Sequence, residues 1–251
     1  MFKFRFLSVF LVGLFLFSCA TGVRSRSLLF RDNAFAVYVV SRNSIKLKSE
    51  ELLPQKLNHP VEITEDKVLD LLGNIRFREE SSYGNVNLFV FEEDEIKEFA
   101  SDLVDGLQKV KPDQILLIVS KYNPIKSVVS HYSRTSFYIW STENTIEIVF
   151  GELQREVTYE EQGNYYDWSN IPDISFDHVP EPDYILPGNG FQFKKVSGFK
   201  NKRWLEFNKK DLERLKFEKR KSKTKEISTD VEKDVNPNQK ITKEDDELLN
   251  D

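Results

Sequence analysis

The chain has 251 residues, and its 36 basic and 41 acidic side chains leave a formal net charge of −5 at pH 7. This modestly acidic balance gives no sequence-wide reason to bind nucleic acid, which excludes nucleic acid as an expected partner. Twenty Phe, nine Tyr and three Trp supply apolar bulk for one packed domain, and a single cysteine excludes a disulfide within the chain.

The first residues have the pattern of a signal peptide. Lys3 and Arg5 give a positively charged start, and residues 6–17 form an apolar run interrupted only by Ser8 and Gly13. A helix of that length covers roughly 18 Å, whereas a bilayer core is about 30 Å thick. The run is therefore too short to span a membrane comfortably, but it has the size of a signal-peptide hydrophobic region.

The stretch Leu16-Phe17-Ser18-Cys19 resembles the lipobox of bacterial lipoproteins, in which a branched aliphatic residue stands three positions before an obligatory cysteine. Phe17 is bulkier than the residue that most lipoboxes have there, and relaxed boxes of this kind are familiar among spirochaetes. The resemblance implies removal of residues 1–18 as a signal peptide, a thioether-linked lipid on Cys19 and acylation of the new amino terminus. It thus implies that the membrane is a partner through a lipid anchor.

The residue after the cysteine indicates a location. Ala20 stands where an Asp would retain an enterobacterial lipoprotein in the inner membrane, which favours the outer membrane of the cell envelope. The leaflet stays open. Two alternatives to lipidation also stay open: an ordinary secretory peptide cut after Ala20, which would discard Cys19, and an uncleaved anchor.

The residues after the cysteine divide into a tether and a domain. Residues 19–33 are predicted to form a lipidated tether, and residues 34–208 a globular domain. The domain starts with residues 34–40 (AFAVYVV), an apolar run rich in β-branched and aromatic side chains that is typical of a strand buried on both faces. Residues 49–59 are expected to form a loop with a helical turn.

A short helix is predicted over residues 63–73. Thr64 can cap its first amide groups, and Gly73 can end it in the left-handed conformation. A strand is expected at residues 74–79.

The longest helix is predicted over residues 93–110, where apolar side chains recur every three or four positions. Acidic residues crowd its first turn, and Pro112 prevents its continuation. The next run, residues 114–120 (QILLIVS), predicts a central strand on which this helix would lie.

Two hairpins follow. Residues 134–140 and 145–150 predict the first, whose second strand is expected to continue to residue 158. Ile146 and Ile148 alternate there with Glu147, which predicts one face buried more deeply than the other.

The second hairpin is predicted from residues 191–196 and 203–207. A short helix is expected over residues 209–221, and a disordered charged tail over residues 222–251. The fold class is therefore α+β: a single domain with a mixed or mainly antiparallel sheet and two or three helices packed on it.

The most unusual stretch, residues 159–190, interleaves aromatic rings with carboxylates among several prolines. Such a composition suits a surface that contacts an envelope protein or a glycan. It equally suits a long connection whose rings dock on the sheet while its acids face water. The candidate binding surface consists of Tyr165, Tyr166, Asp167, Trp168, Asp177 and Tyr184.

Signatures of catalysis, cofactors and metals are missing from the sequence. The three histidines, His59, His131 and His178, lie far apart in the chain, and no EF-hand pattern appears. We therefore expect no catalytic residue, no cofactor and no metal ligand.

The sequence favours a membrane-anchored lipoprotein of the cell envelope that acts as a non-enzymatic binding or assembly component. The alternative is a tethered envelope hydrolase that uses carboxylates as acid and base on glycan or peptide. A solute-binding protein is a weaker third option, because that architecture usually needs two lobes.

Overall fold

The computed structural model describes residues 26–47, 49–81, 84–123, 132–162, 167–177 and 182–220. The predicted signal peptide, Cys19 and the predicted tail lie outside the described residues. So do Tyr165 and Tyr166. The fold belongs to a unit that ends at Phe217.

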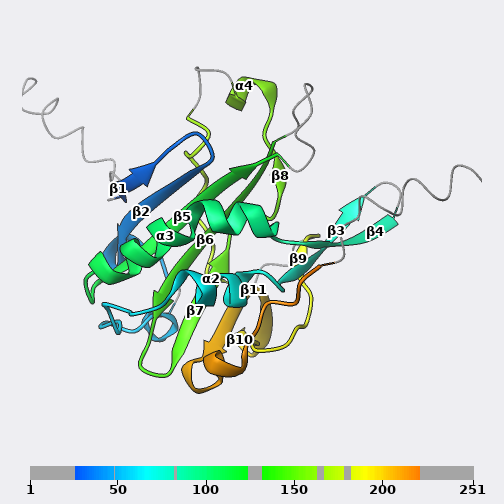
Figure 1. The fold of residues 1–251 in the computed structure, drawn as a ribbon. Coiled ribbons are helices and arrows are strands. Elements are labelled where there is room, and N and C mark those ends of the chain that lie inside the picture. The colour runs from blue at the N-terminus through cyan, green and yellow to red at the C-terminus, as the bar shows by residue number, and fades with distance from the viewer. Residues whose placement is uncertain are drawn as a thin grey trace, which may run out of the picture. The chain divides into compact units, whose positions relative to one another are not determined.

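One large sheet organises the fold (Figure 1). All of its described strand pairs are antiparallel. In spatial order its strands are β1 (Arg26–Arg31), β2 (Phe35–Ser41), β5 (Gln114–Tyr122), β6 (Ser133–Ser141), β7 (Thr145–Phe150), β11 (Phe199–Asn208) and β10 (Gln192–Val196), and the two-residue strand β8 (Arg155–Glu156) pairs with β6.

Helices cover one face of this sheet (Figure 1). The main one, α3 (Glu93–Lys109), packs beside α2 (Glu65–Leu72). Thr64 caps α2 as the sequence predicts, since its side chain accepts a hydrogen bond from the Lys67 amide. The predicted acidic first turn of α3 is confirmed, and Glu92 and Glu95 in addition form a capping box there. The other helical segments are α4 (Tyr159–Gln162) and the 3₁₀ turns η1 (Arg42–Ser44), η2 (Glu50–Leu52) and η3 (Lys209–Arg214).

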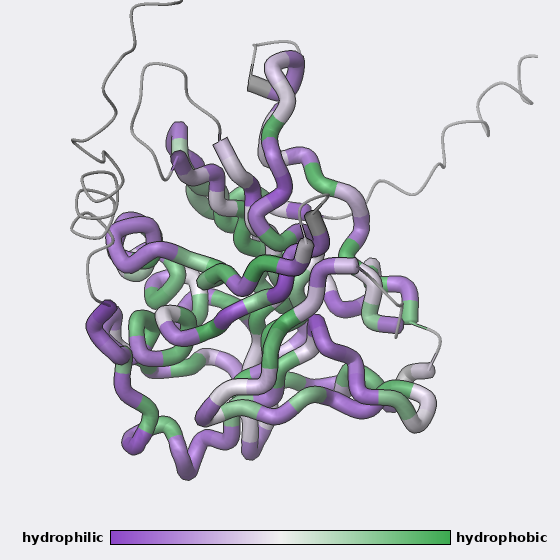
Figure 2. The backbone as a smooth tube through the Cα atoms, turned by 90° about the vertical axis from the view of Figure 1, so that its right-hand side faces the viewer, coloured by the Kyte–Doolittle hydropathy of each residue, from purple (hydrophilic) through white to green (hydrophobic). Residues whose placement is uncertain are grey.

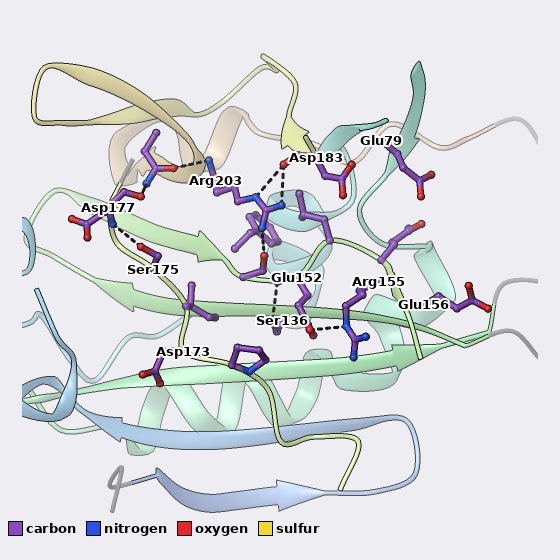
Figure 3. Close-up of a pocket in the computed structure, with 17 residues that line it drawn as sticks. Glu79, Ser136, Glu152, Arg155, Glu156, Asp173, Ser175, Asp177, Asp183 and Arg203 are labelled. Atoms are coloured by element: carbon purple, nitrogen blue, oxygen red, sulfur yellow. Dashed lines mark hydrogen bonds and ion pairs between the residues drawn. The ribbon is translucent and has the colours of Figure 1, made fainter. Parts of the chain in front are cut away.

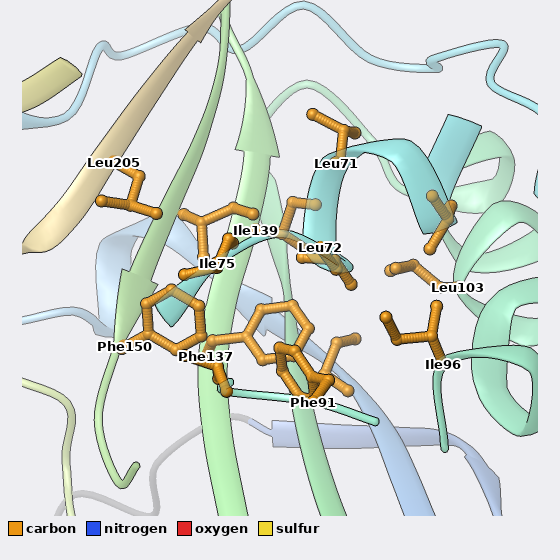
Figure 4. Close-up of a cluster of buried hydrophobic side chains, with 14 of the residues drawn as sticks. Leu71, Leu72, Ile75, Phe91, Ile96, Leu103, Phe137, Ile139, Phe150 and Leu205 are labelled. Atoms are coloured by element: carbon orange, nitrogen blue, oxygen red, sulfur yellow. The ribbon is translucent and has the colours of Figure 1, made fainter. Parts of the chain in front are cut away.

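The core between the helices and the sheet is rich in phenylalanine (Figure 4). Phe91 makes edge contacts with Phe99 of α3 and Phe137 of β6, with ring centroids 5.7 and 5.6 Å apart. Leu71 and Leu72 of α2 belong to the same cluster. The apolar stripe predicted on the long helix is thus confirmed as its buried face.

The opposite face of the sheet carries a second core, covered by irregular chain. Trp140 and Trp204 meet there at 5.6 Å, and Phe176 from the segment 167–177 packs against both. Because both faces are covered, β2 and β5 are buried on both sides, as their continuous apolar sequences predict. Figure 2 shows hydrophobic positions gathered in the central elements and hydrophilic ones in the peripheral loops.

A smaller antiparallel sheet extends from the body in Figure 1. Its central strand, β3 (Arg76–Ser81), pairs with β4 (Gly84–Phe89) on one side and with the short β9 (Tyr184–Ile185) on the other. The strand predicted at 74–79 is confirmed as β3. The fold is therefore a single α+β domain with mainly antiparallel sheets, as expected.

The tether prediction is wrong for its second half. Residues predicted to link lipid and domain form β1, which pairs with β2 along Arg26–Arg31. Most side chains of β1 are exposed, so the strand is held by backbone pairing and carries little apolar periodicity. The folded domain begins by Arg26 instead of residue 34.

Three other predictions need correction. The strand β7 ends at Phe150, and β8 is a separate strand. Both faces of β7 are buried, including the Glu147 side chain, because the second core covers the face predicted to be shallow. The helix predicted over 209–221 is only the 3₁₀ turn η3, with no helix among described residues after Arg214.

Gly73 ends α2, but in a right-handed conformation with φ of −65°. A close approach explains the glycine: a Cβ at this position would lie 2.4 Å from Cδ2 of Phe217. The predicted left-handed stop is therefore wrong, and the physical reason for glycine is the close approach of the Phe217 ring and of the Leu69 carbonyl oxygen, which would lie 2.7 Å from the same Cβ.

Candidate functional site

The described residues of the predicted binding surface do not form one surface. Trp168 is only 8% exposed and belongs to the second core. Its ring lies 4.9 Å from the Lys121 ammonium and 5.5 Å from the Arg31 guanidinium. Asp167 pairs with Arg31 at 2.9 Å and accepts hydrogen bonds from the amide and hydroxyl of Ser169. This part of the loop is a docked connection.

Tyr184 lies in β9, where it supports the smaller sheet. The Arg78 guanidinium and the Lys202 ammonium lie 5.9 and 3.8 Å from its ring centre. Its hydroxyl accepts a hydrogen bond of 3.4 Å from Arg78. Asp177, another residue of the predicted binding surface, lines a pocket.

That pocket, the acidic pocket from here on, has a volume of about 500 Å³ and is shown in Figure 3. It lies where the end of β7, the segment 172–177 and β11 meet. Asp173 and Asp177 come from one side in this view, and Glu79 and Glu156 from the other. Its charged lining side chains are Glu79, Glu152, Glu156, Asp173, Asp177, Asp183, Arg155 and Arg203.

A break in the β7 strand creates the pocket floor. After Phe150 the chain turns, and Gln154 adopts a left-handed φ of 47°. Its side-chain amide donates to the carbonyls of Phe89 and Val90 at 2.7 and 3.1 Å, which fixes the turn against the end of β4. A Cβ on Gly151 would lie 2.7 Å from Cγ1 of Ile174, so glycine lets the segment 172–177 approach closely.

The wall opposite is held by β11. Arg203 donates two hydrogen bonds to the Asp183 carbonyl, at 3.0 and 3.1 Å, and one to the Gly151 carbonyl. The Asn201 side-chain amide donates to the carbonyl of Asp177 at 3.2 Å. These bonds fix the backbone that presents the Asp177 and Asp183 carboxylates.

One carboxylate of the pocket is engaged in a buried ion-pair network. Arg134, almost fully buried, donates to both oxygens of Glu152 at 2.5 and 2.8 Å and to the Trp168 carbonyl at 2.7 Å. Arg155 donates to Glu152 at 2.8 Å and pairs with Glu161. Arg134 of β6 therefore joins Glu152 to the segment 167–177, and Glu152 serves as a structural anchor.

The pocket as a whole favours positive charge. Two of its six carboxylates have arginine partners: Glu152 with Arg134 and Arg155, and Asp173 with Arg26 at 3.5 Å. Four further carboxylates, those of Glu79, Glu156, Asp177 and Asp183, line the pocket together with the Arg203 guanidinium. Carboxylates gathered around a concave surface concentrate negative potential there. The chemistry that this arrangement supports is recognition of a cationic group.

The carboxyl groups with clearly raised pKa lie elsewhere. Burial raises the pKa of Glu95 to about 7, and burial raises that of Glu147, which accepts hydrogen bonds from Trp204 and Thr145. Glu95 belongs to the first turn of α3, and Glu147 belongs to β7. Burial also lowers the pKa of His59 to about 4. None of these groups lines the acidic pocket.

Sequence reasoning singled out Asp177 but missed most of the pocket. Its walls come from positions as distant as Glu79 and Arg203, and no local motif links them.

Among the described residues, no three His, Cys, Asp or Glu side chains are grouped as a metal site would need. Within the same part of the chain, no helix is long and apolar enough to cross a bilayer. Comparisons with models of protein families, with curated proteins and with solved structures found no match.

Proposed function

We propose that this chain is a lipid-anchored protein of the cell envelope, in the outer membrane, that works by binding a partner through the acidic pocket. The anchor is proposed on the signal-peptide pattern and the lipobox-like sequence ending at Cys19. The observation that carries the binding function is the pocket of about 500 Å³ with its excess of carboxylates. A ligand that fits this chemistry presents Lys or Arg side chains, as a basic segment of an envelope protein does.

A tethered hydrolase is the alternative, and the site gives it less support. Carboxylate catalysis at neutral pH needs an acid whose pKa is raised, usually by burial, near a second carboxylate. The described groups with raised pKa, including Glu95 and Glu147, lie outside the pocket. Glu152 has both oxygens bound to arginines. The arrangement therefore favours charge recognition over acid–base chemistry.

The binding proposal is tested with a fluorescent pentalysine peptide as a minimal cationic probe. Glu79→Gln and Asp177→Asn together remove charge from opposite sides of the pocket in Figure 3 while keeping side-chain shape. We expect the double variant to bind pentalysine at least about tenfold more weakly by fluorescence anisotropy, because two favourable charge interactions are lost. Each tenfold loss corresponds to about 1.4 kcal/mol.

The matched control is Asp66→Asn with Glu98→Gln, which removes the same charge from exposed positions on α2 and α3. It should keep affinity within about twofold of the wild type. Equal losses in the two double variants would mean that the peptide responds only to net charge, and the pocket would then be rejected as the binding site. The anchor is tested separately, by mass spectrometry of the amino-terminal peptide of the mature protein.

A further inference from the structure

The edge strand β1 exposes two adjacent leucines. Leu28 is 55% exposed and Leu29 is 39% exposed, whereas most large apolar side chains of the described residues are buried. The register with β2 shifts between Leu28 and Phe30, so the regular alternation of side chains is interrupted at Leu29. Cδ2 of Leu29 lies 3.5 Å from where a Cβ on Gly106 of α3 would stand, so Leu29 lies on the helix side of this edge. No described segment pairs with the outer side of β1.

This strand is also the part of the fold that follows the proposed anchor. Only residues 20–25 separate Cys19 from Arg26. An extended chain spans at most about 3.3 to 3.6 Å per residue, so β1 starts within roughly 25 Å of a lipid attached to Cys19. Leu28 lies within roughly 32 Å of it by the same measure.

We propose that the β1 edge rests against the bilayer surface, with Leu28 and Leu29 entering the boundary between headgroups and acyl chains. This inference rests on the proposed lipidation of Cys19. Two partly exposed leucines bury too little area to hold a membrane alone, but the tether keeps them at a high effective concentration beside it. The unpaired backbone of β1 limits the depth, because its polar groups need water or headgroups as partners.

A second copy of the chain is the competing occupant of this edge. A stable interface usually buries about 800 Å² per partner, and two leucines on a six-residue strand supply only a small part of that area. The short tether instead places a lipid surface beside β1 in every molecule. The short distance along the chain between Cys19 and β1 therefore favours the membrane over a second copy as the surface that contacts this edge.

The test uses the mature, lipidated full chain in phosphatidylcholine vesicles. Leu28→Cys gives one thiol for an environment-sensitive fluorophore, because the thioether-linked lipid blocks the Cys19 sulfur. The matched control is Phe199→Cys: Phe199 is 65% exposed and starts β11, which pairs with β10 at the opposite edge of the sheet. Five strand spacings of about 4.8 Å separate β1 from β11 by roughly 24 Å.

We expect lipid-borne quenchers to reduce emission at position 28 at least about threefold more than at position 199. A Leu29→Cys probe should behave like position 28, which guards against a folding defect in one variant. Equal quenching at positions 28 and 199 would overturn the proposal. A blue-shifted emission that depends on protein concentration without lipid quenching would also overturn it, in favour of a second copy.

Mass spectrometry of the same samples separates the two proposals. An unmodified Cys19 would remove the anchor and, with it, the reason for membrane contact. A lipidated Cys19 with a water-exposed probe at position 28 would reject the orientation of β1 alone and leave the anchor intact.

Discussion

At the scale of single residues, Glu95 links the main helix to the centre of the sheet. One of its carboxyl oxygens accepts a hydrogen bond of 2.6 Å from the Ser120 hydroxyl of β5, and the other accepts one of 3.2 Å from the Glu92 amide. Burial raises its pKa to about 7, and the charges of Glu92 and Asp94 add to this rise. The folded protein therefore favours the protonated form.

This pKa makes the free energy of unfolding depend on pH. Between about pH 4.5 and pH 7 the unfolded chain releases the Glu95 proton while the folded chain keeps it, so stability falls as pH rises through that window. The loss is at most on the order of 3 kcal/mol. We expect Glu95→Gln, which stays neutral, to lose less stability than the wild type between pH 4 and pH 8 in urea unfolding.

Glu98→Gln is the control for that measurement, since it removes an exposed carboxylate from the same helix. It should keep the pH dependence of the wild type. Identical pH dependence in the wild type and in Glu95→Gln would contradict the assignment of the effect to the buried carboxyl group.

At the scale of elements, the end of α2 is set by the segment that returns after η3. The Asp70 carboxylate of α2 accepts a hydrogen bond of 2.8 Å from the Phe217 amide, and the Phe217 ring fills the space beside Gly73. Gly73→Ala would force this ring or the helix end to move. We expect a loss of about 1 to 3 kcal/mol in the free energy of unfolding, as overpacking typically costs.

Measuring Gly73→Ala in a chain that also lacks the Phe217 ring tests whether this ring is what excludes a larger side chain at position 73. Gly73 has right-handed backbone angles, which alanine adopts readily. A Cβ at this position would also lie 2.7 Å from the Leu69 carbonyl oxygen, which stays in place when the ring is removed. In a Phe217→Ala chain, Gly73→Ala should therefore cost less stability than in the wild type, because only the carbonyl contact remains. An equal loss in both backgrounds would show that the ring is not the obstacle.

The sequence patterns predicted the elements whose buried side chains are apolar. The runs that became β2 and β5, and the stripe on α3, are apolar because a core covers them. Strands β1 and β4 were missed because most of their side chains are exposed and backbone pairing defines them. Gly73 could not be interpreted correctly because Phe217 is distant in sequence.

The candidate site was even less predictable, because tertiary contacts assemble it. Asp177 was singled out by its aromatic and acidic neighbourhood, yet the same neighbourhood suggested an exposed Trp168, which packs in the second core. A sequence of aromatic residues among carboxylates looks the same whether the rings pack on the protein's own sheet or contact a binding partner. Only the fold places Glu79 and Asp183 beside Asp177 in one pocket.

At the scale of the whole molecule, β1 completes the large sheet at the side nearest the proposed anchor. It pairs with β2 over most of its length, and β2 in turn pairs with β5 in the centre. A chain starting at Ala34 would leave β2 as the edge strand. Its sequence, FAVYVVS, is apolar, uncharged and β-branched, which is the composition of an aggregation-prone edge.

We therefore expect a chain that starts at Arg26 to stay monomeric in size-exclusion chromatography, and one that starts at Ala34 to self-associate. The difference follows from backbone pairing, since β1 occupies the outer hydrogen-bonding groups of β2 and contributes few buried side chains. Replacing Val39, half-buried on β2, with Lys in the shorter chain should reduce its association, because an edge charge opposes strand pairing. Equal monomer fractions for the Arg26 and Ala34 chains would mean that β1 is dispensable to the sheet. The domain boundary would then return to residue 34.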